Sequence, residues 1–328
     1  MTAARPRIAV TGNIPTPGLE HLRLSGDVWA WDGDDMPDID VLHGAIAGAD
    51  AAVTLLTTKV DDAFLEAAGP QLKVVANVAV GYNNIDVAAC AARGITVTNT
   101  PGVLTDATAD IAMALVLMAT RRLGEGERII RSQTTWRWGM SFLLGTGVQG
   151  RQLGIIGMGD IGTAVARRAK AFGMQIAYAN RRPVAAAIEA ELGATYLTID
   201  DLLASSDVVS LHCPYSPATH HLIDAVALAR MQPTAYLVNT ARGPVVDEAA
   251  LVDALEHGVI AGAGLDVFEH EPAVHPGLLR CENAVLIPHL GSATVETRAA
   301  MAVLAARNAV AVLAGRPPLT PVGLSADR

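Results

Sequence analysis

The sequence has no excess of positive charge, which bears on the kind of partner it can bind. Its 24 Lys and Arg residues against 33 Asp and Glu residues give a net charge of −9. Such a chain has no basic footprint for the phosphate backbone of a nucleic acid. We therefore expect no nucleic-acid partner.

Long apolar runs are also missing, although 51% of the residues are hydrophobic. A membrane-spanning helix needs about 20 consecutive apolar residues. The longest candidate, 111–119, is bounded by Asp110 and Arg121 and is typical of a buried core helix. Residues 1–6 lack the charged and apolar regions of a secretory signal. We expect no membrane partner and a cytoplasmic location.

Cysteine is scarce and unpaired in the sequence. Cys90, Cys213 and Cys281 lie far apart, and no C-x-x-C pair is present. This pattern indicates neither a disulfide framework nor a zinc site. We expect a reducing compartment and no bound metal.

What the sequence does contain is a regular alternation of short apolar runs with segments of helical length. This alternation predicts parallel sheets with helices on both faces, hence an α/β fold. It occurs twice, and at about 100 to 200 residues per domain the length of 328 residues also fits two domains. The first set of predicted strands is 8–10, 28–31, 52–56, 74–77 and 95–98, and the second is 153–156, 175–179, 208–212, 236–239, 261–266 and 285–287.

Between the two sets lies a segment of a different kind. Residues 105–122 form an apolar helical stretch, and residues 123–150 carry six glycines and two tryptophans with little periodicity. We interpret the segment as a connecting helix followed by an arm. A last helical pattern, 294–313, has an apolar face that could return to the first domain, which would then be discontinuous.

A glycine-rich motif follows the first strand of the second set. Gly157, Gly159 and Gly162 fit G-x-G-x-x-G between an apolar strand and an amphipathic helix. In this setting the first glycine permits a tight turn, the second lets a pyrophosphate approach the backbone, and the third packs the helix on the strand. An ordinary glycine-rich turn is the alternative, but the context favours a dinucleotide site on the helix N-terminus.

The end of the next strand bears on the choice of cofactor. An NAD-preferring site usually has an acid there for the ribose 2′-hydroxyl, whereas this chain has Asn180, Arg181 and Arg182. Guanidinium groups can bind a 2′-phosphate with paired hydrogen bonds. We predict NADP(H) over NAD(H), the alternative being a solvated arginine pair.

Three polar side chains follow later strands of the second set. Arg242, Glu271 and His289 each lie after an apolar strand, at the edge where open parallel sheets bind ligands. Arginine can hold a carboxylate, histidine can exchange a proton near neutral pH, and glutamate stabilises an imidazolium. Each alone could be structural. Together they predict reduction of a 2-oxo acid, with His289 as the general acid.

Several segments resemble the D-isomer-specific 2-hydroxyacid dehydrogenases, most closely the glyoxylate and hydroxypyruvate reductases. They are 80–86, 157–162, 239–246, 264–272 and 288–294. The resemblance implies a Rossmann-type cofactor domain and a flavodoxin-like substrate domain with a cleft between them. Residues 1–100 and 294–328 would form the discontinuous substrate domain, and 101–293 the dinucleotide-binding domain with a dimerisation arm within 105–150. One departure is Asn83, where many members have aspartate.

The resemblance also assigns roles to residues. Arg242, Glu271 and His289 match the family's catalytic residues, and Val80 and Gly81 would hold the substrate carboxylate with Arg242. Leu55 and Leu56 would line the pocket. Asp266 matches the residue that meets the nicotinamide carboxamide. The remaining predicted cofactor contacts are Thr108, Gly157, Met158, Gly159, Asp160, Ile161, Gly162, Asn180, Arg181, Arg182, Cys213, Pro214, Thr240, Ala241, Arg242, His289 and Gly291.

The predicted function is thus NADPH-preferring reduction of glyoxylate or hydroxypyruvate by a homodimer. A D-lactate-type or broad-specificity 2-hydroxyacid dehydrogenase stays open, because the sequence does not position the side chains that set pocket size. A dinucleotide-sensing co-repressor is the alternative from another class, since proteins of this fold include non-enzymes.

Overall fold

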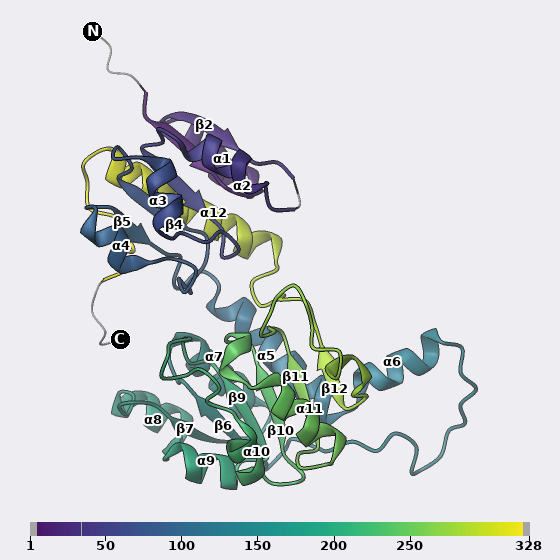
Figure 1. Cartoon of the computed structure of the whole chain (residues 1–328). Coiled ribbons are helices and arrows are strands. Elements are labelled where there is room, and N and C mark those ends of the chain that lie inside the picture. The colour runs from purple at the N-terminus through teal and green to yellow at the C-terminus, as the bar shows by residue number, and fades with distance from the viewer. Residues whose placement is uncertain (1–4, 34, 324–328) are drawn as a thin grey trace. The chain divides into compact units, whose positions relative to one another are not determined.

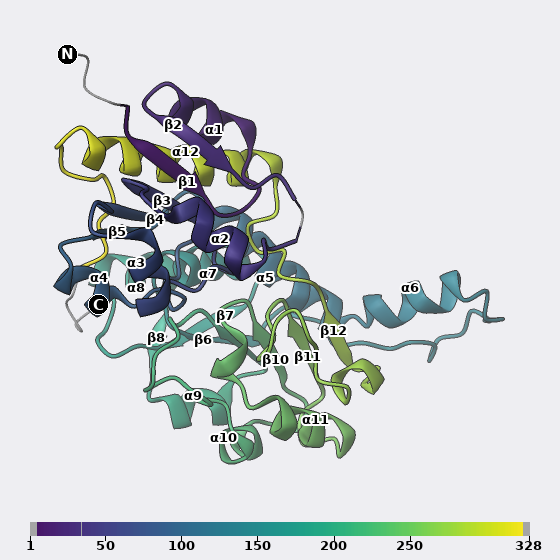
Figure 2. The same ribbon diagram turned by 45° about the horizontal axis from the view of Figure 1, so that its top comes forward.

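The chain divides into two units, unit 1 comprising 1–104 and 293–328 and unit 2 comprising 105–292. The structure is a computed structural model that describes residues 5–33 and 35–323. The expectation about a secretory signal involves residues 1–4, which lie outside the described residues. Figures 1 and 2 show the ribbon in two views.

Unit 1 is a parallel sheet of five strands in the order β2-β1-β3-β4-β5. This is the flavodoxin-like order, in which the chain places β2 on one side of β1 and then adds β3 and the later strands on the other side. β3 and β4 are buried along their whole length, as parallel strands covered on both faces must be. The elements are β1 (Arg7–Val10), α1 (Thr16–Arg23), β2 (Asp27–Ala30), α2 (Ile39–Ile46), β3 (Ala51–Thr54), α3 (Asp62–Ala68), β4 (Val74–Asn77), α4 (Val87–Ala92), β5 (Thr96–Thr98) and α12 (Val295–Leu313).

α12 completes unit 1 although it comes last in the sequence. It packs against α1, β3 and β4, and a Cβ atom added at Gly18 of α1 would lie 2.7 Å from the Cβ of Ala302 in α12. The two helices therefore approach closely only because position 18 has no side chain. The last helix of the chain thus packs on the strands of its first hundred residues.

Unit 2 has a parallel sheet of seven strands in the order β12-β11-β10-β9-β6-β7-β8. From β6 the chain adds strands toward one edge of the sheet as far as β8, and from β9 it adds them toward the other edge, as in the Rossmann fold. The elements are α5 (Thr105–Thr120), α6 (Leu123–Arg131), β6 (Gln152–Ile156), α7 (Asp160–Ala171), β7 (Gln175–Ala179), α8 (Ala186–Leu192), β8 (Thr195–Tyr196), α9 (Ile199–Ser205), β9 (Val208–Leu211), α10 (Ala225–Arg230), β10 (Tyr236–Asn239), α11 (Glu248–Glu256), β11 (Gly262–Leu265) and β12 (Ala284–Leu286). The predicted α/β class with two parallel sheets is confirmed.

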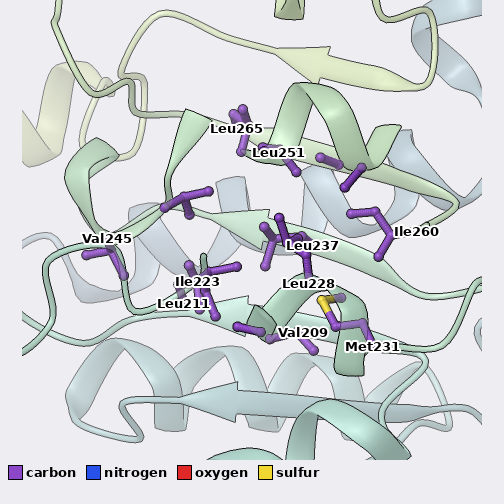
Figure 3. Packing of buried hydrophobic residues seen from close by; sticks show 14 of the residues in the cluster. Val209, Leu211, Ile223, Leu228, Met231, Leu237, Val245, Leu251, Ile260 and Leu265 are labelled. Atoms are coloured by element: carbon purple, nitrogen blue, oxygen red, sulfur yellow. The ribbon is translucent and has the colours of Figure 1, made fainter. Parts of the chain in front are cut away.

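Apolar clusters lie on both faces of the unit 2 sheet. One cluster contains residues of α5 and α7, and the other contains residues of α9, α10 and α11. Figure 3 shows the second, in which Leu211, Leu237 and Leu265 of three neighbouring strands meet Leu228 and Leu251 of the covering helices. These clusters hold the strands rigidly, so the loops at their carboxyl ends have fixed starting points.

The arm differs from its prediction in one respect. The helix α6 occupies Leu123–Arg131, within the segment for which the sequence indicates little periodicity. Its two glycines weaken the helical pattern, whereas ion pairs of Arg122 with Glu125 and of Arg131 with Glu127 support the helix. Both views show α6 and the following chain extending away from the sheet of unit 2 (Figures 1 and 2). The short edge strand β8 is also absent from the predicted strands.

Candidate functional site

The glycine motif forms a tight turn against the end of β9. Gly157 has a φ of +95°, and a Cβ there would lie 2.4 Å from the backbone nitrogen of Cys213. A Cβ at Gly162 would lie 2.6 Å from the carbonyl oxygen of Gly157, whereas nothing lies within 4 Å of a Cβ at Gly159. The first and third glycines thus permit close packing, and the second leaves the backbone open to a ligand.

A nicotinamide dinucleotide therefore fits the start of α7. Gly159 is the residue preceding the helix, and the first N–H groups of any helix have no acceptor within it. Those of Asp160 and Ile161 open this helix and suit a pyrophosphate. The N–H of Met158 differs, because it donates to Oδ1 of Asn180 at 2.7 Å. The Met158 side chain is 2% exposed and belongs to the core.

The Asn180 side chain therefore holds the glycine turn in place, and we call this contact the clasp. Its Nδ2 also donates to the carbonyl oxygen of Met158 at 3.3 Å, and its own carbonyl accepts from the Tyr196 hydroxyl. Arg181 and Arg182 follow it and are exposed. Two guanidinium groups and no carboxylate thus follow β7 at the position where NAD-preferring sites have an acid.

His289 and Glu271 form a hydrogen-bonded pair. The distance from Nδ1 of His289 to Oε2 of Glu271 is 2.8 Å, and the two side chains are 28% and 29% exposed. The other carboxylate oxygen, Oε1, accepts from the N–H of Phe268. Burial favours the neutral form of Glu271, but the hydrogen bond and charge of His289 outweigh it, so the pKa of Glu271 lies below its ordinary value. The pair therefore holds an imidazole against an ionised carboxylate.

Asp266 holds the loop that carries His289. Its carboxylate accepts from the N–H groups of Leu290 and Gly291, and its carbonyl accepts from the N–H of His289. The residue is 1% exposed, and burial raises its pKa against these hydrogen bonds. His289 itself has a left-handed φ of +52°. The conformation of the loop that contains His289 thus depends on Asp266, independently of the contact with the nicotinamide carboxamide that the resemblance implies.

Arg242 lies in the turn after β10, the strand beside β11. The Asn239 side chain builds its turn, since Nδ2 donates to the carbonyl of Arg242 and Oδ1 accepts from the N–H of Ala241. A Cβ at Gly243 would lie 1.9 Å from the carbonyl carbon of Phe268, so this turn touches the loop that carries Glu271. Burial lowers the pKa of the Arg242 guanidinium, against the charge of Glu271, which raises it.

The three predicted catalytic residues therefore come from neighbouring strands of one sheet. β10, β11 and β12 are adjacent and parallel, so Arg242, Glu271 and His289 follow strand ends on the same edge. His289 contacts Glu271 directly, and the charge of Glu271 acts on Arg242. A positive group, a proton-exchanging ring and a carboxylate are thereby brought together.

His212 is a residue of this edge that the sequence analysis did not single out. It follows β9 and lies between two hydroxyl groups, with Ser210 at 2.8 Å from Nε2 and Thr240 at 3.3 Å from Nδ1. Burial lowers its pKa to about 4, so it is neutral at neutral pH. It supports the turn that contains Thr240 and Ala241. The one feature of the sequence that could have indicated His212 as a site residue was its position at the end of the predicted strand 208–212.

The other predicted cofactor contacts of unit 2 have varied surroundings. Thr108 of α5 is buried, and a Cβ at Gly291 would lie 3.4 Å from its Cγ2. Cys213 is buried, which raises the pKa of its thiol to about 11, and Pro214 is exposed. Cys213 is therefore an uncharged group beside the glycine turn.

The predicted substrate-binding residues other than Arg242 lie in unit 1, after the adjacent strands β3 and β4. Leu55 is half-buried, Leu56 is exposed, and Val80 and Gly81 are half-buried. Nδ2 of Asn84 donates to the carbonyls of Leu55 and Thr58. The loops after these two strands are thus tied to each other.

The described residues contain neither a metal-binding cluster nor a membrane-spanning helix. Among residues 5–33 and 35–323 no group of three or more His, Cys, Asp or Glu side chains could hold a metal ion. Within the same residues no helix is long and apolar enough to cross a bilayer.

Comparison with known proteins gives consistent matches. Residues 113–291 match the family profile "D-isomer specific 2-hydroxyacid dehydrogenase, NAD binding domain". A glyoxylate reductase from Thermococcus litoralis is 46% identical over 321 residues, covering 96% of each chain. One from Korarchaeum cryptofilum is 48% identical over 320 residues, covering 96% of this chain and 95% of the relative.

Solved structures are similar over the same length. An NADPH-dependent glyoxylate/hydroxypyruvate reductase from Sinorhizobium meliloti, in complex with NADP and malonate, has a TM-score of 0.85 and 39% identity, covering 98% of this chain and 97% of that one. A glyoxylate reductase from Paecilomyes thermophila has a TM-score of 0.88 and 36% identity, with coverages of 98% and 99%.

Proposed function

The chain belongs to the D-isomer specific 2-hydroxyacid dehydrogenases, which are NAD(P)-dependent enzymes, and we propose that it reduces glyoxylate or hydroxypyruvate with a preference for NADPH. The observation that carries this proposal is the pair of His289 and Glu271, 2.8 Å apart on the sheet edge that also carries Arg242. The names of similar proteins support the substrate class.

Each residue of the site then has a chemical task. A bound nicotinamide dinucleotide supplies the hydride. His289, protonated at both ring nitrogens, donates the proton on Nε2 to the substrate's carbonyl oxygen, because Nδ1 is engaged with Glu271. Glu271 stabilises the imidazolium and fixes the ring. Arg242 binds the substrate carboxylate and stabilises charge on the developing alkoxide.

Unit 1 would contribute the remaining substrate contacts. The backbone N–H groups of Val80 and Gly81 would bind the same carboxylate, and Leu55 and Leu56 would limit the size of the substrate. In this proposal unit 1 is the substrate domain and unit 2 is the dinucleotide-binding domain.

The preference for NADPH rests on the end of β7. Asn180 is neutral and clasps the glycine turn, so it presents no carboxylate to repel a 2′-phosphate. Arg181 and Arg182 are exposed and follow directly, where their guanidinium groups can bind that phosphate. The pyrophosphate would lie on the first turn of α7, Asp266 would meet the carboxamide, and the segments around Thr108, Cys213, Pro214, Thr240 and Gly291 would border the cofactor.

We also propose a homodimer and a cytoplasmic location. Trp136, Trp138, Met140 and Phe142 of the arm are exposed to 48%, 78%, 80% and 40%, and large apolar side chains on an exposed segment are typical of an interface. The three free cysteines suit a reducing compartment.

A substrate and cofactor panel tests the proposed function. We expect NADPH consumption with glyoxylate and hydroxypyruvate at a higher kcat/KM than with pyruvate, and a lower kcat/KM with NADH. Equal values for all three acids would indicate a broad-specificity dehydrogenase. A preference for NADH would contradict the role given to Arg181 and Arg182.

A further inference from the structure

Three consecutive carbonyl groups of the loop after β4 are held by donors outside the loop. The oxygen of Ala79 accepts from the backbone N–H of Thr100 at 2.9 Å. The oxygen of Val80 accepts from Nδ2 of Asn99 at 2.8 Å, and that of Gly81 accepts from Nδ2 of Asn77 at 2.9 Å. All three donors belong to the ends of β4 and β5, so the loop is fixed on one side.

Holding a carbonyl also sets the direction of the next N–H. The peptide group is planar and trans, so the C=O of one residue and the N–H of the next point in opposite directions within one rigid plane. The bond from Thr100 to Ala79 therefore orients the N–H of Val80. The bond from Asn99 to Val80 orients the N–H of Gly81 in the same way.

We propose that Asn99 is a positioning residue for substrate binding: its side-chain amide orients the peptide plane that presents the Gly81 N–H to the substrate carboxylate. The identity of that ligand rests on the proposed function. The orientation rests on the hydrogen bonds alone. Asn99 does not touch the substrate in this proposal, and it acts through the carbonyl of Val80.

The last segment of the described chain holds Asn99 in turn. The Thr320 hydroxyl donates to the carbonyl of Asn99 at 2.6 Å, and the N–H of Asn99 donates to the carbonyl of Thr320. Asn308 of α12, which is fully buried, binds Thr320 through Nδ2 to Oγ1 at 2.7 Å and through Oδ1 to the backbone N–H. A continuous chain of hydrogen bonds thus runs from α12 to the loop that contains Gly81.

The experiment compares four variants in steady-state kinetics. Asn99→Ala removes the donor without adding charge, and Asn99→Asp replaces it with an acceptor that faces the Val80 oxygen. We expect both to raise KM for glyoxylate by about tenfold, as for the loss of one hydrogen bond to a charged ligand, with kcat and KM for NADPH near the wild-type values. Thr320→Val, which removes one hydroxyl, should raise KM for glyoxylate by a smaller factor.

Asn283→Asp is the control, because the Asn283 amide, like that of Asn99, donates to backbone carbonyl groups, here those of Leu255 and Ala261, but lies in unit 2. It should leave KM for glyoxylate unchanged. An unchanged KM for glyoxylate in both Asn99 variants would overturn the proposal. A parallel rise in KM for NADPH would do the same, because it would indicate general damage to the protein.

A second measurement does not depend on turnover. Amide hydrogen exchange of a peptide covering 78–86, measured by mass spectrometry without ligands, should be faster in Asn99→Ala and Thr320→Val than in the wild type and in Asn283→Asp. Unchanged exchange would refute the positioning role. If the wild type reduced no 2-oxo acid, the proposed function would fail while this measurement still decided whether Asn99 orders the loop.

Discussion

At the scale of single residues, His289 and Glu271 are matched by a second pair of the same kind. Nε2 of His221 lies 2.7 Å from Oε1 of Glu269, also in unit 2, and His221 too has a positive φ. A hydrogen-bonded histidine and glutamate are therefore not sufficient to identify a catalytic pair. What separates His289 is its place at the end of β12, beside the ends of β10 and β11.

Replacing His289 tests this distinction. We expect His289→Ala to lower kcat for glyoxylate reduction by about 10²- to 10⁴-fold, because a general acid is lost, while the dissociation constant of NADPH stays near the wild-type value. His221→Ala removes the other pair and should leave kcat near the wild-type value. Steady-state kinetics and fluorescence titration with NADPH provide the two readouts. Near-normal turnover in His289→Ala would remove this histidine from the mechanism.

His212 gives a prediction about stability and pH. Burial lowers its pKa to about 4, whereas the unfolded chain has the ordinary value of 6.5. Between these pH values the unfolded state binds more protons than the folded state, so the free energy of unfolding falls as the pH is lowered from 6.5 to 4. The contribution is about 3 kcal/mol.

Urea unfolding at a series of pH values measures this contribution. His212→Gln should lose this part of the pH dependence even if it is less stable at neutral pH, because the variant has no titrating group at that position. His257→Gln, which removes an exposed histidine, should retain it. A wild-type slope in His212→Gln would show that other groups cause the loss of stability.

At the scale of elements, the strand–turn–helix of β6 and α7 has some features that local sequence fixes and others that depend on tertiary packing. The glycine spacing predicts the turn, and the strand and helix flank it at the predicted positions. The clasp from Asn180 to Met158 was not predictable from spacing, because it depends on β7 lying beside β6 in one register. The helix α6 was missed because two glycines interrupt its pattern.

Two glycines of this turn should respond differently to the same change. Gly157→Ala should lower the free energy of unfolding by about 3 kcal/mol, because it forces a side chain into a positive φ and against the backbone of Cys213. Gly159→Ala should keep nearly wild-type stability, since its φ is −88° and the space around it is open. It should instead weaken NADPH binding by blocking the approach of the phosphates.

Urea unfolding and NADPH titration of the two variants check this contrast. Equal stability of the two variants would contradict the packing argument. Unchanged NADPH affinity in Gly159→Ala would contradict the location of the pyrophosphate.

At the scale of the whole molecule, residues 131–142 of the arm are exposed along their whole length. Trp136 and Phe142 stack on each other with ring centroids 5.8 Å apart, while Trp138 and Met140 are 78% and 80% exposed. We expect the double substitution Trp138→Ser and Met140→Ser to shift the protein from the proposed dimer to a monomer, because it removes apolar contact area.

Sedimentation velocity over a range of protein concentrations measures this shift. Val226→Ser is the control, because Val226 is also apolar and 58% exposed but lies on α10. It should keep the wild-type mass. An unchanged mass in the double variant would mean that the arm does not carry the interface.

Apart from α6 and β8, the alternation of strands and helices follows from the residues in their order along the chain, as do the glycine turn and the strand ends after which Arg242, Glu271 and His289 lie. These features depend on residues close together in the sequence, on the period of the apolar residues and on the backbone conformations open to glycine, and each of these can be read from the sequence. Three contacts follow only from the tertiary structure: Asn180 binds Met158, the half-buried His212 lies between two hydroxyl groups, and Thr320 binds Asn99 from 221 positions away. Such contacts arise when packing brings distant segments together and each buried polar group must find a partner, and no spacing rule records which partner that is.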